Sequence, residues 1–214
     1  MEQSKKYELL NKDIIELGGI TLFRIKALIS FGNVKKGELG GYVEKEDNLC
    51  HSGNAWVTDN AKVSGNAKVT GDAEVTGDAK VTENARVTGN TRVTGNARVY
   101  GSARVTGDAK VSDYAKVTGN AWVSGNAEVT DFAWVTGNAK VTGNAKVTGD
   151  AWVSENAKVS GNAKVNGDAE VTENAKVTGN AKVTGNAEVN GNAEVTGDAE
   201  VNGNAEVTGG ELLN

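Results

Sequence analysis

Residues 137–148 read G-N-A-K-V-T-G-N-A-K-V-T, and this six-residue phrase repeats with small variations from residue 52 to residue 209. Valine recurs at every sixth position from Val57 to Val207, which gives 26 valines without an exception. Alanine stands two positions before the valine in 25 of the 26 units, and Thr91 is the single substitute. A disordered, low-complexity segment has no reason to keep such a phase, so the register predicts a folded repeat.

The spacing of alanine and valine predicts the conformation of each unit. Residues two apart on a strand point to the same side, so we expect Ala61 and Val63 to face inward while Lys62 faces solvent. The Gly-Asn or Gly-Asp pair between units predicts a corner, because glycine accepts a positive φ without steric cost and Asn and Asp tolerate the left-handed region best. A short strand and a bend in every unit are typical of a hexapeptide β-helix.

In these features the chain resembles the hexapeptide-repeat family over residues 52–209. Proteins of that family form a left-handed parallel β-helix of triangular cross-section, in which three hexads make one coil. The resemblance therefore implies an all-β fold with about nine coils for the 26 hexads. It also implies a trimer, since trimers are common in the family. Residues 37–57, G-E-L-G-G-Y-V-E-K-E-D-N-L-C-H-S-G-N-A-W-V, are similar to the start of bacterial and phage hexapeptide-repeat proteins.

The N-terminal segment, residues 1–50, departs from the repeat and holds most of the large apolar side chains. Two apolar runs, residues 14–17 and 20–25, flank Gly18-Gly19, which predicts a β-hairpin with a tight turn. A solenoid needs a cover over its end, because that end exposes both the core and strand edges. We therefore expect three segments: a small β-rich N-terminal cap at residues 1–50, the β-helix at residues 51–209 and a C-terminal cap at residues 210–214.

Composition and charge exclude several classes of protein. The formal net charge is −5, which gives no whole-molecule attraction for duplex nucleic acid or an anionic membrane. No window approaches the ~20 apolar residues of a membrane span, and residues 1–13 lack a stretch of signal-peptide type. Cys50 is the single cysteine, which excludes an internal disulfide framework. We expect a cytoplasmic protein whose partners are neither membranes nor duplex nucleic acid.

Stacking the hexads in threes places every third hexad in one column, and the outward residues that precede each valine then form three distinct faces. The basic face reads Lys68, Arg86, Arg104, Trp122, Lys140, Lys158, Lys176, Glu194. The mixed face reads Trp56, Glu74, Arg92, Lys110, Glu128, Lys146, Lys164, Lys182, Glu200. The aromatic face reads Lys62, Lys80, Arg98, Lys116, Trp134, Trp152, Glu170, Glu188, Glu206.

The basic face is cationic from Lys68 to Lys176, interrupted only by Trp122. Like charges stacked directly above one another repel, so a bound anion would compensate this ladder. Local ion pairs are the competing explanation, and they are expected from three glutamates that each stand three positions before a cation: Glu83, Glu155 and Glu173. Two cations flanking an indole suit a small planar anion such as a nucleotide. The candidate ligand-binding residues are therefore Arg86, Arg104, Trp122 and Lys140.

Four aromatic side chains gather on the aromatic face. Trp134 and Trp152 are separated by three hexads and are expected to stack. Tyr114 and Phe132, separated in the same way, replace the corner Asn on the same face. Contiguous exposed apolar surface marks an interaction site, so homo-oligomerisation through these four residues is the leading interpretation. Local corner packing and docking of the N-terminal segment are the alternatives.

Catalysis is not favoured. Hexapeptide-repeat acyltransferases use a histidine base and often an extruded loop, whereas this chain has one histidine, His51, and no insertion in any hexad. By hexad phase His51 falls in an inward valine position and Leu49 in an alanine position, which favours a packed histidine. Because neighbouring strand residues point to opposite faces, Cys50 is not expected to pair with it. We expect no catalytic residue, metal or cofactor, and an acyltransferase using His51 is the alternative.

The sequence thus favours a non-catalytic β-solenoid of a bacterium or phage that acts as a scaffold or binding protein. The threonine that follows most valines gives a minor alternative, ice binding, which requires a flat array of hydroxyls. Each threonine here shares its strand with a long charged or aromatic side chain, which breaks such an array. Strand propensity and ladder hydrogen bonds account for the threonines.

Overall fold

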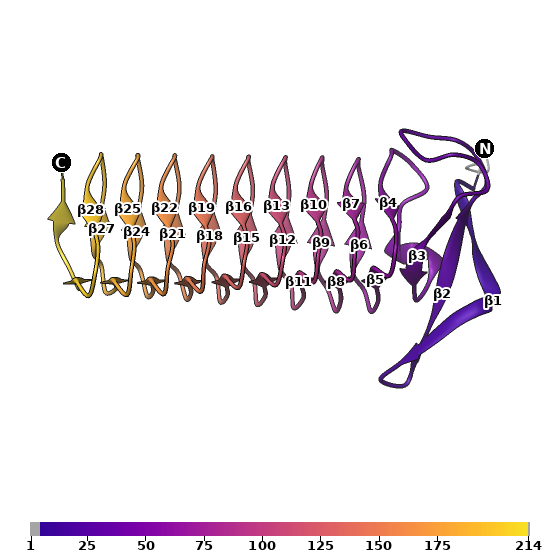
Figure 1. Cartoon of the computed structure of the whole chain (residues 1–214), viewed down its shortest axis with the longest axis horizontal. Helices are drawn as coiled ribbons and strands as arrows, with labels where there is room; N and C mark the ends of the chain where they lie inside the picture. The colour runs from indigo at the N-terminus through magenta and orange to yellow at the C-terminus, as the bar shows by residue number, and fades with distance from the viewer. Residues whose placement is uncertain (1–4, 214) are drawn as a thin grey trace.

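The computed structural model describes residues 5–213 and shows a straight stack of coils, a parallel β-solenoid with an antiparallel hairpin at its N-terminal end (Figure 1). The all-β prediction is confirmed, and the one helical turn among the described residues is the 3₁₀ turn η1 (Glu46–Asn48). Residues 1–4 and 214, which belong to the predicted end segments, lie outside the described residues. No helix in the described part of the chain is long and apolar enough to cross a membrane.

Three sheets form the sides of the stack, and each corresponds to one predicted face. The sheet of the aromatic face has 12 strands, in spatial order β1 (Tyr7–Leu17), β2 (Ile20–Ala27), β3 (Leu39–Val43), β5 (Lys62–Val63), β8 (Lys80–Val81), β11 (Arg98–Val99), β14 (Lys116–Val117), β17 (Trp134–Val135), β20 (Trp152–Val153), β23 (Glu170–Val171), β26 (Glu188–Val189) and β29 (Glu206–Val207). The last ten of these belong to coils, so the stack has about ten coils.

The other two sheets have nine strands each. That of the mixed face contains β4 (Trp56–Val57), β7 (Glu74–Val75), β10 (Arg92–Val93), β13 (Lys110–Val111), β16 (Glu128–Val129), β19 (Lys146–Val147), β22 (Lys164–Val165), β25 (Lys182–Val183) and β28 (Glu200–Val201). That of the basic face contains β6 (Lys68–Val69), β9 (Arg86–Val87), β12 (Arg104–Val105), β15 (Trp122–Val123), β18 (Lys140–Val141), β21 (Lys158–Val159), β24 (Lys176–Val177), β27 (Glu194–Val195) and β30 (Glu211–Leu212).

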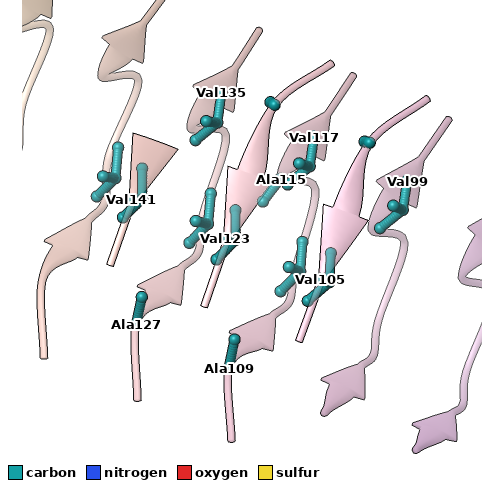
Figure 2. Packing of buried hydrophobic residues seen from close by; sticks show 14 of the residues in the cluster. Val99, Val105, Ala109, Ala115, Val117, Val123, Ala127, Val135 and Val141 are labelled. Atoms are coloured by element: carbon teal, nitrogen blue, oxygen red, sulfur yellow. The ribbon is translucent and has the colours of Figure 1, made fainter. Parts of the chain in front are cut away.

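Parallel pairing between hexads of successive coils builds the core of the repeat. Val99 pairs with Val81 on one side and with Val117 on the other, so identical side chains lie above one another. Figure 2 shows such columns of valine and alanine filling the interior. From Ala55 to Val195, every alanine and valine of the repeat is fully buried. The interior is therefore a stack of small apolar side chains, as the hexad predicts.

The corners are hydrogen-bonded from coil to coil as well. The backbone N–H of Asn144 donates to the carbonyl of Gly161 at 2.7 Å, and the Asn144 side-chain amide donates to Asn162 Oδ1 at 3.0 Å. Gly143 has a φ of 72°, and a Cβ at that position would lie 2.9 Å from the carbonyl oxygen of Gly161. Glycine is therefore favoured at such a corner by backbone conformation and by the close approach of the next coil. Six corners instead hold an acidic residue at positive φ: Asp59, Glu83, Asp113, Asp131, Glu155 and Glu173.

The predicted hairpin is confirmed and is longer than expected. β1 and β2 pair antiparallel around Gly18-Gly19, and a bulge between Leu10 and Ile14 lets residues 7–10 join the ladder. β2 pairs antiparallel with β3, and β3 pairs parallel with β5. The hairpin therefore continues the sheet of the aromatic face at the N-terminal end, and the coils begin before the first hexad (Figure 1).

The first coil is longer than the others, which corrects two predicted positions. Val43 pairs with Val63 and Leu49 with Val69, and both offsets exceed the regular three hexads by two positions. The extra positions fall in the bend that contains His51. Leu49 therefore occupies a valine position, where it is buried, and His51 does not occupy an inward valine position. The positions predicted for Leu49 and His51 were wrong because the prediction applied the six-residue spacing to residues that precede the first regular hexad.

Thr91, which replaces alanine in one hexad, supplies a test of the core. Its side chain is fully buried, and its hydroxyl has no hydrogen-bond partner among residues 5–213. Thr91→Val keeps the shape and removes the buried hydroxyl, so we expect the free energy of unfolding to rise on the order of 1 kcal/mol. Denaturant or thermal unfolding measures this change. Thr94→Val, at a partly exposed position, is the matched control, and an equal gain there would contradict the explanation.

Candidate functional site

The basic face brings the four candidate ligand residues together. They lie on the consecutive strands β9, β12, β15 and β18, with Arg104 paired in the ladder to Arg86 and Trp122. The ammonium of Lys140 lies 5.9 Å from the centre of the Trp122 ring, and the indole N–H donates to Thr106 Oγ1 at 3.2 Å. The indole is thus held against the preceding coil, with part of its surface open to solvent. The residues form a continuous cationic and aromatic strip.

The expected local ion pairs on this face do not form. Glu83 sits at a corner with a φ of 62°, and its carboxylate accepts the N–H of Gly101 in the next coil at 2.9 Å instead of pairing with Arg86. Neither Glu155 nor Glu173 makes an ion pair within residues 5–213. The only ion pair of this face there joins Lys176 and Glu194, which follow each other in the ladder. The carboxylate of Glu83 is directed along the stack because its left-handed corner points the side chain to the next coil.

The aromatic face brings its four predicted residues together in two pairs. The rings of Tyr114 and Phe132 are stacked, with centres 5.0 Å apart and planes 8° apart. Trp134 and Trp152 are neighbours in the ladder but meet edge to face, at 6.3 Å and 71°, so their predicted stacking was wrong. Lys116 lies 4.0 Å over the Trp134 ring and competes for that face of the indole. All four aromatic side chains are 40–55 % exposed.

A shallow groove of about 310 Å³ joins these aromatic rings to two cations. It is lined by Asn96, Arg98, Tyr114, Lys116, Phe132 and Trp134. The sequence interpretation of this site missed Arg98 and Lys116, although both stand in the same column as the tryptophans. The structure shows that Arg98 and Lys116 line the groove, because it places these strand residues next to the corner residues Tyr114 and Phe132.

The mixed face differs from the other two because its charges pair within the chain. Glu128 lies between Lys146 at 2.9 Å and Lys110 at 3.6 Å, and these ammonium groups lower the pKa of its carboxyl. Arg92 pairs with Glu74 at 3.5 Å. A groove of about 450 Å³ lies between the N-terminal end of this face and the loop after β2, and both apolar side chains, such as Val34 and Trp56, and charged ones, such as Asp72, line it. Cations lie beside glutamates along much of this column, so adjacent coils neutralise each other.

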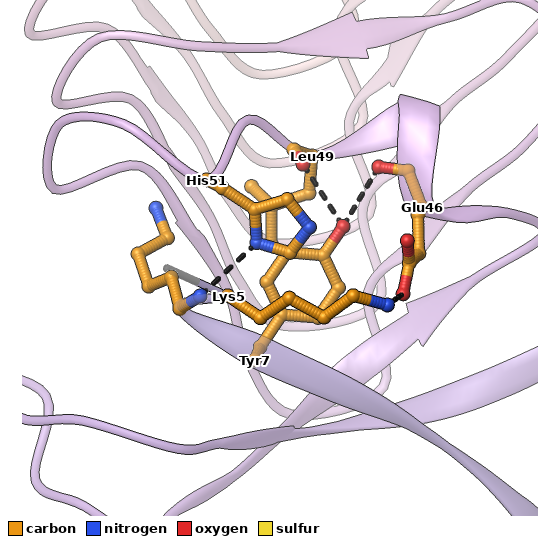
Figure 3. A network of polar contacts seen from close by, with 6 residues as sticks. Lys5, Tyr7, Glu46, Leu49 and His51 are labelled. Carbon is orange, nitrogen blue, oxygen red and sulfur yellow. Dashed lines mark hydrogen bonds and ion pairs between the residues drawn. The ribbon is translucent and has the colours of Figure 1, made fainter. Parts of the chain in front are cut away.

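His51 packs against the N-terminal strand (Figure 3). Its ring stacks on Tyr7 with centres 4.4 Å apart, and its Nδ1 accepts the backbone N–H of Lys6 at 3.1 Å. The hydroxyl of Tyr7 donates to the carbonyls of Glu46 and Leu49 at 2.7 and 2.9 Å. Burial lowers the pKa of the imidazole, and Nε2 is buried without a partner in the described part of the chain. Nδ1 is therefore occupied by a backbone hydrogen bond, and Nε2 is shielded from solvent.

Lys6 anchors the same strand and gave no signal in the sequence. The side chain is 1 % exposed, and its ammonium donates to the carbonyls of Ala55 at 2.8 Å and Gly53 at 3.3 Å. It also lies 4.6 Å from the centre of the Phe31 ring. Burial lowers the pKa of this amine to about 8. Residues 5–213 contain no cluster of three or more His, Cys, Asp or Glu side chains that could hold a metal ion.

The chain was compared with known proteins. A scan against models of protein families found no match, and a search of curated proteins found none.

The buried amine of Lys6 predicts an unusual dependence of stability on pH. In the unfolded chain Lys6 stays protonated up to its ordinary pKa near 10.5, whereas in the folded chain it loses its proton above about pH 8. The unfolded state therefore binds more protons between these values, so the free energy of unfolding rises with pH, by about 2 kcal/mol from pH 8 to 10.

Chemical denaturation at several pH values, compared with Lys6→Met, measures this effect. The variant retains Cys50, whose pKa is lowered, and Tyr7, whose pKa is raised by burial. Any rise that persists in the variant belongs to other groups. Equal pH profiles of the two proteins between pH 8 and 10 would contradict the assignment to Lys6.

Proposed function

We propose that the chain is a non-catalytic scaffold of a bacterium or phage that associates with itself through the aromatic face. The observation that carries the proposal is the cluster of Tyr114, Phe132, Trp134 and Trp152, exposed on neighbouring coils of one flat side. Large contiguous apolar surface is rare on monomers and marks interaction sites. Aromatic residues also dominate the binding energy of known interfaces.

We also infer that the solenoid is of the left-handed hexapeptide-repeat kind. The coil of three hexads, the inward alanine and valine and the glycine corners support this assignment. The left hand rests on the family resemblance alone. The general preference for right-handed crossovers between parallel strands would favour the opposite hand.

A structural role for His51 fits this function better than an acyltransferase role. The Nδ1 atom is occupied by the N–H of Lys6, and Nε2 is covered. A general base needs a nitrogen within hydrogen-bond reach of the substrate proton. The imidazole instead holds the N-terminal strand against the bend of the first coil.

Removal of the two exposed indoles tests the association. We expect the wild-type chain to be larger than a monomer by multi-angle light scattering or sedimentation. Trp134→Ala with Trp152→Ala should weaken self-association at least tenfold in Kd, because the apolar centre of the contact is lost. Trp122→Ala, on the basic face, is the control and should leave the mass unchanged. A monodisperse wild-type monomer at high concentration would overturn the proposal.

Binding of a small anion on the basic face is a second candidate function. Arg86, Arg104 and Lys140 have no ion pair in the described chain, and Trp122 offers an indole between two of them. A planar anionic ligand such as a nucleotide would stack on the ring and neutralise the ladder.

Calorimetry with a panel of nucleotides tests the basic face. Trp122→Ala and Arg104→Ala should each weaken binding about tenfold, because one removes the stacking surface and the other a cation beside it. Arg92→Ala on the mixed face is matched to Arg104→Ala and should bind as the wild type does. The absence of heat with every nucleotide, or equal affinities of all variants, would contradict this function.

A further inference from the structure

Charge is distributed differently on the aromatic and mixed faces. On the mixed face, cations and glutamates pair with each other between coils. On the aromatic face, the nine outward residues before valine form no ion pair with any group in residues 5–213. The aromatic face therefore carries seven charges that the described chain leaves uncompensated.

The order of those residues is not random. Four cations come first, two tryptophans stand in the middle, and three glutamates follow: Lys62, Lys80, Arg98, Lys116, Trp134, Trp152, Glu170, Glu188 and Glu206. The parallel register places each residue directly beside the next one in this series. Like charges therefore lie side by side within each block and repel. A partner surface whose charges run in the opposite order, from glutamates to cations, would neutralise both blocks.

We propose that this partner is a second copy of the chain, packed face to face with its solenoid axis antiparallel. This inference rests on the proposed self-association and specifies its geometry. The twofold axis runs along the strand direction, midway between β17 and β20. Trp134 then faces the partner's Trp152, and every cation from Lys80 onward faces a glutamate. The three charge pairs, each formed twice by symmetry, are Lys116 with the partner's Glu170, Arg98 with the partner's Glu188 and Lys80 with the partner's Glu206.

The groove on this face fits the same arrangement. The strands that line it, β11, β14 and β17, lie opposite the partner's coils that carry Glu188, Glu170 and Trp152. The antiparallel copy thus presents an indole and two carboxylates to a hollow lined by aromatic rings and two cations. Apolar anchors at the centre and charged residues around them are the usual anatomy of an interface.

Parallel arrangements do not satisfy these charges. In a dimer or trimer about an axis along the stack, coils of the same level meet, so the cations at Arg98 and Lys116 would face other cations. The neighbouring basic face is also cationic at that level, at Arg86 and Arg104. The trimer implied by the family resemblance would therefore bring like charges together, and their repulsion would weaken it. An antiparallel arrangement removes this repulsion.

The extent of the surface is sufficient for a specific dimer. From β8 to β29 the ladder has eight strands, which span roughly 35 Å at about 4.8 Å per strand. With a side about 20 Å wide, the strip covers roughly 700 Å² per partner, close to the ~800 Å² of a standard interface.

Two charge-reversal variants test the arrangement. Lys80→Glu with Arg98→Glu and Lys116→Glu makes the column acidic at both ends, and Glu170→Lys with Glu188→Lys and Glu206→Lys makes it basic at both ends. Each variant alone should be monomeric because its own copies repel, and an equimolar mixture should restore the dimer. The restored mixture shows that both variants fold.

A control for charge alone uses three lysines of the other faces that make no ion pair in the described residues: Lys68→Glu, Lys158→Glu and Lys164→Glu together. This variant should dimerise as the wild type does. The wild-type dimer should also weaken as salt screens the charge pairs, with a rise in Kd of at least tenfold between low and high ionic strength.

Cross-linking determines the register. In a Cys50→Ser background, oxidation of a mixture of Lys116→Cys and Glu170→Cys chains should give a disulfide-linked heterodimer, while Lys116→Cys alone should not cross-link. Cross-linking of Lys116→Cys with itself, or charge variants that remain associated alone, would overturn the antiparallel dimer while leaving association through the tryptophans intact. A monomeric wild-type chain would overturn both.

Discussion

The ladder of backbone hydrogen bonds between coils is the interaction on which the rest of the structure depends. The strands of the hexads are very short and have no stability alone, so their donors and acceptors are satisfied only by the coils before and after them. The interior is too narrow for large side chains, and alanine and valine fill it in columns. A shift of the spacing by a single position would move these side chains out of the core.

This constraint explains why the outer surface is free to vary. The inward positions are fixed by packing, and the corners are restricted to residues that accept a positive φ, which are mostly glycine. Trp56, the residue before the first valine, is buried against Tyr7 and Phe31. In the later hexads the residue before each valine lies on the surface, so its chemistry is not set by the core. The three faces use that freedom differently, since one pairs its charges internally and two leave most of theirs open.

The N-terminal segment obeys different rules because it must join an antiparallel hairpin to a parallel stack. The larger first coil accommodates that change of geometry, and Lys6, Tyr7 and His51 fix the junction through buried polar contacts. These contacts join parts of the chain that are far apart in sequence, and they show no periodicity. The hexad pattern reveals the repeat because the repeat is periodic, and it says nothing about these long-range contacts, each of which occurs once.

The hexad period by itself determined the all-β repeat with its inward alanine and valine. The coil of three hexads came from the family resemblance, and the membership of each face followed from that coil together with the period. The sequence also determined the hairpin, through two apolar runs around a Gly-Gly turn. Tertiary structure alone decided the longer offset in the first coil and the partners of His51, which are Tyr7 and Lys6. It also decided the direction of Glu83 toward Gly101 and the edge-to-face contact of Trp134 with Trp152. Each of these depends on where side chains find partners in three dimensions. The six-residue period specifies which side of the strand a residue is on, but it does not specify the side-chain rotamer or the neighbouring group that the side chain contacts.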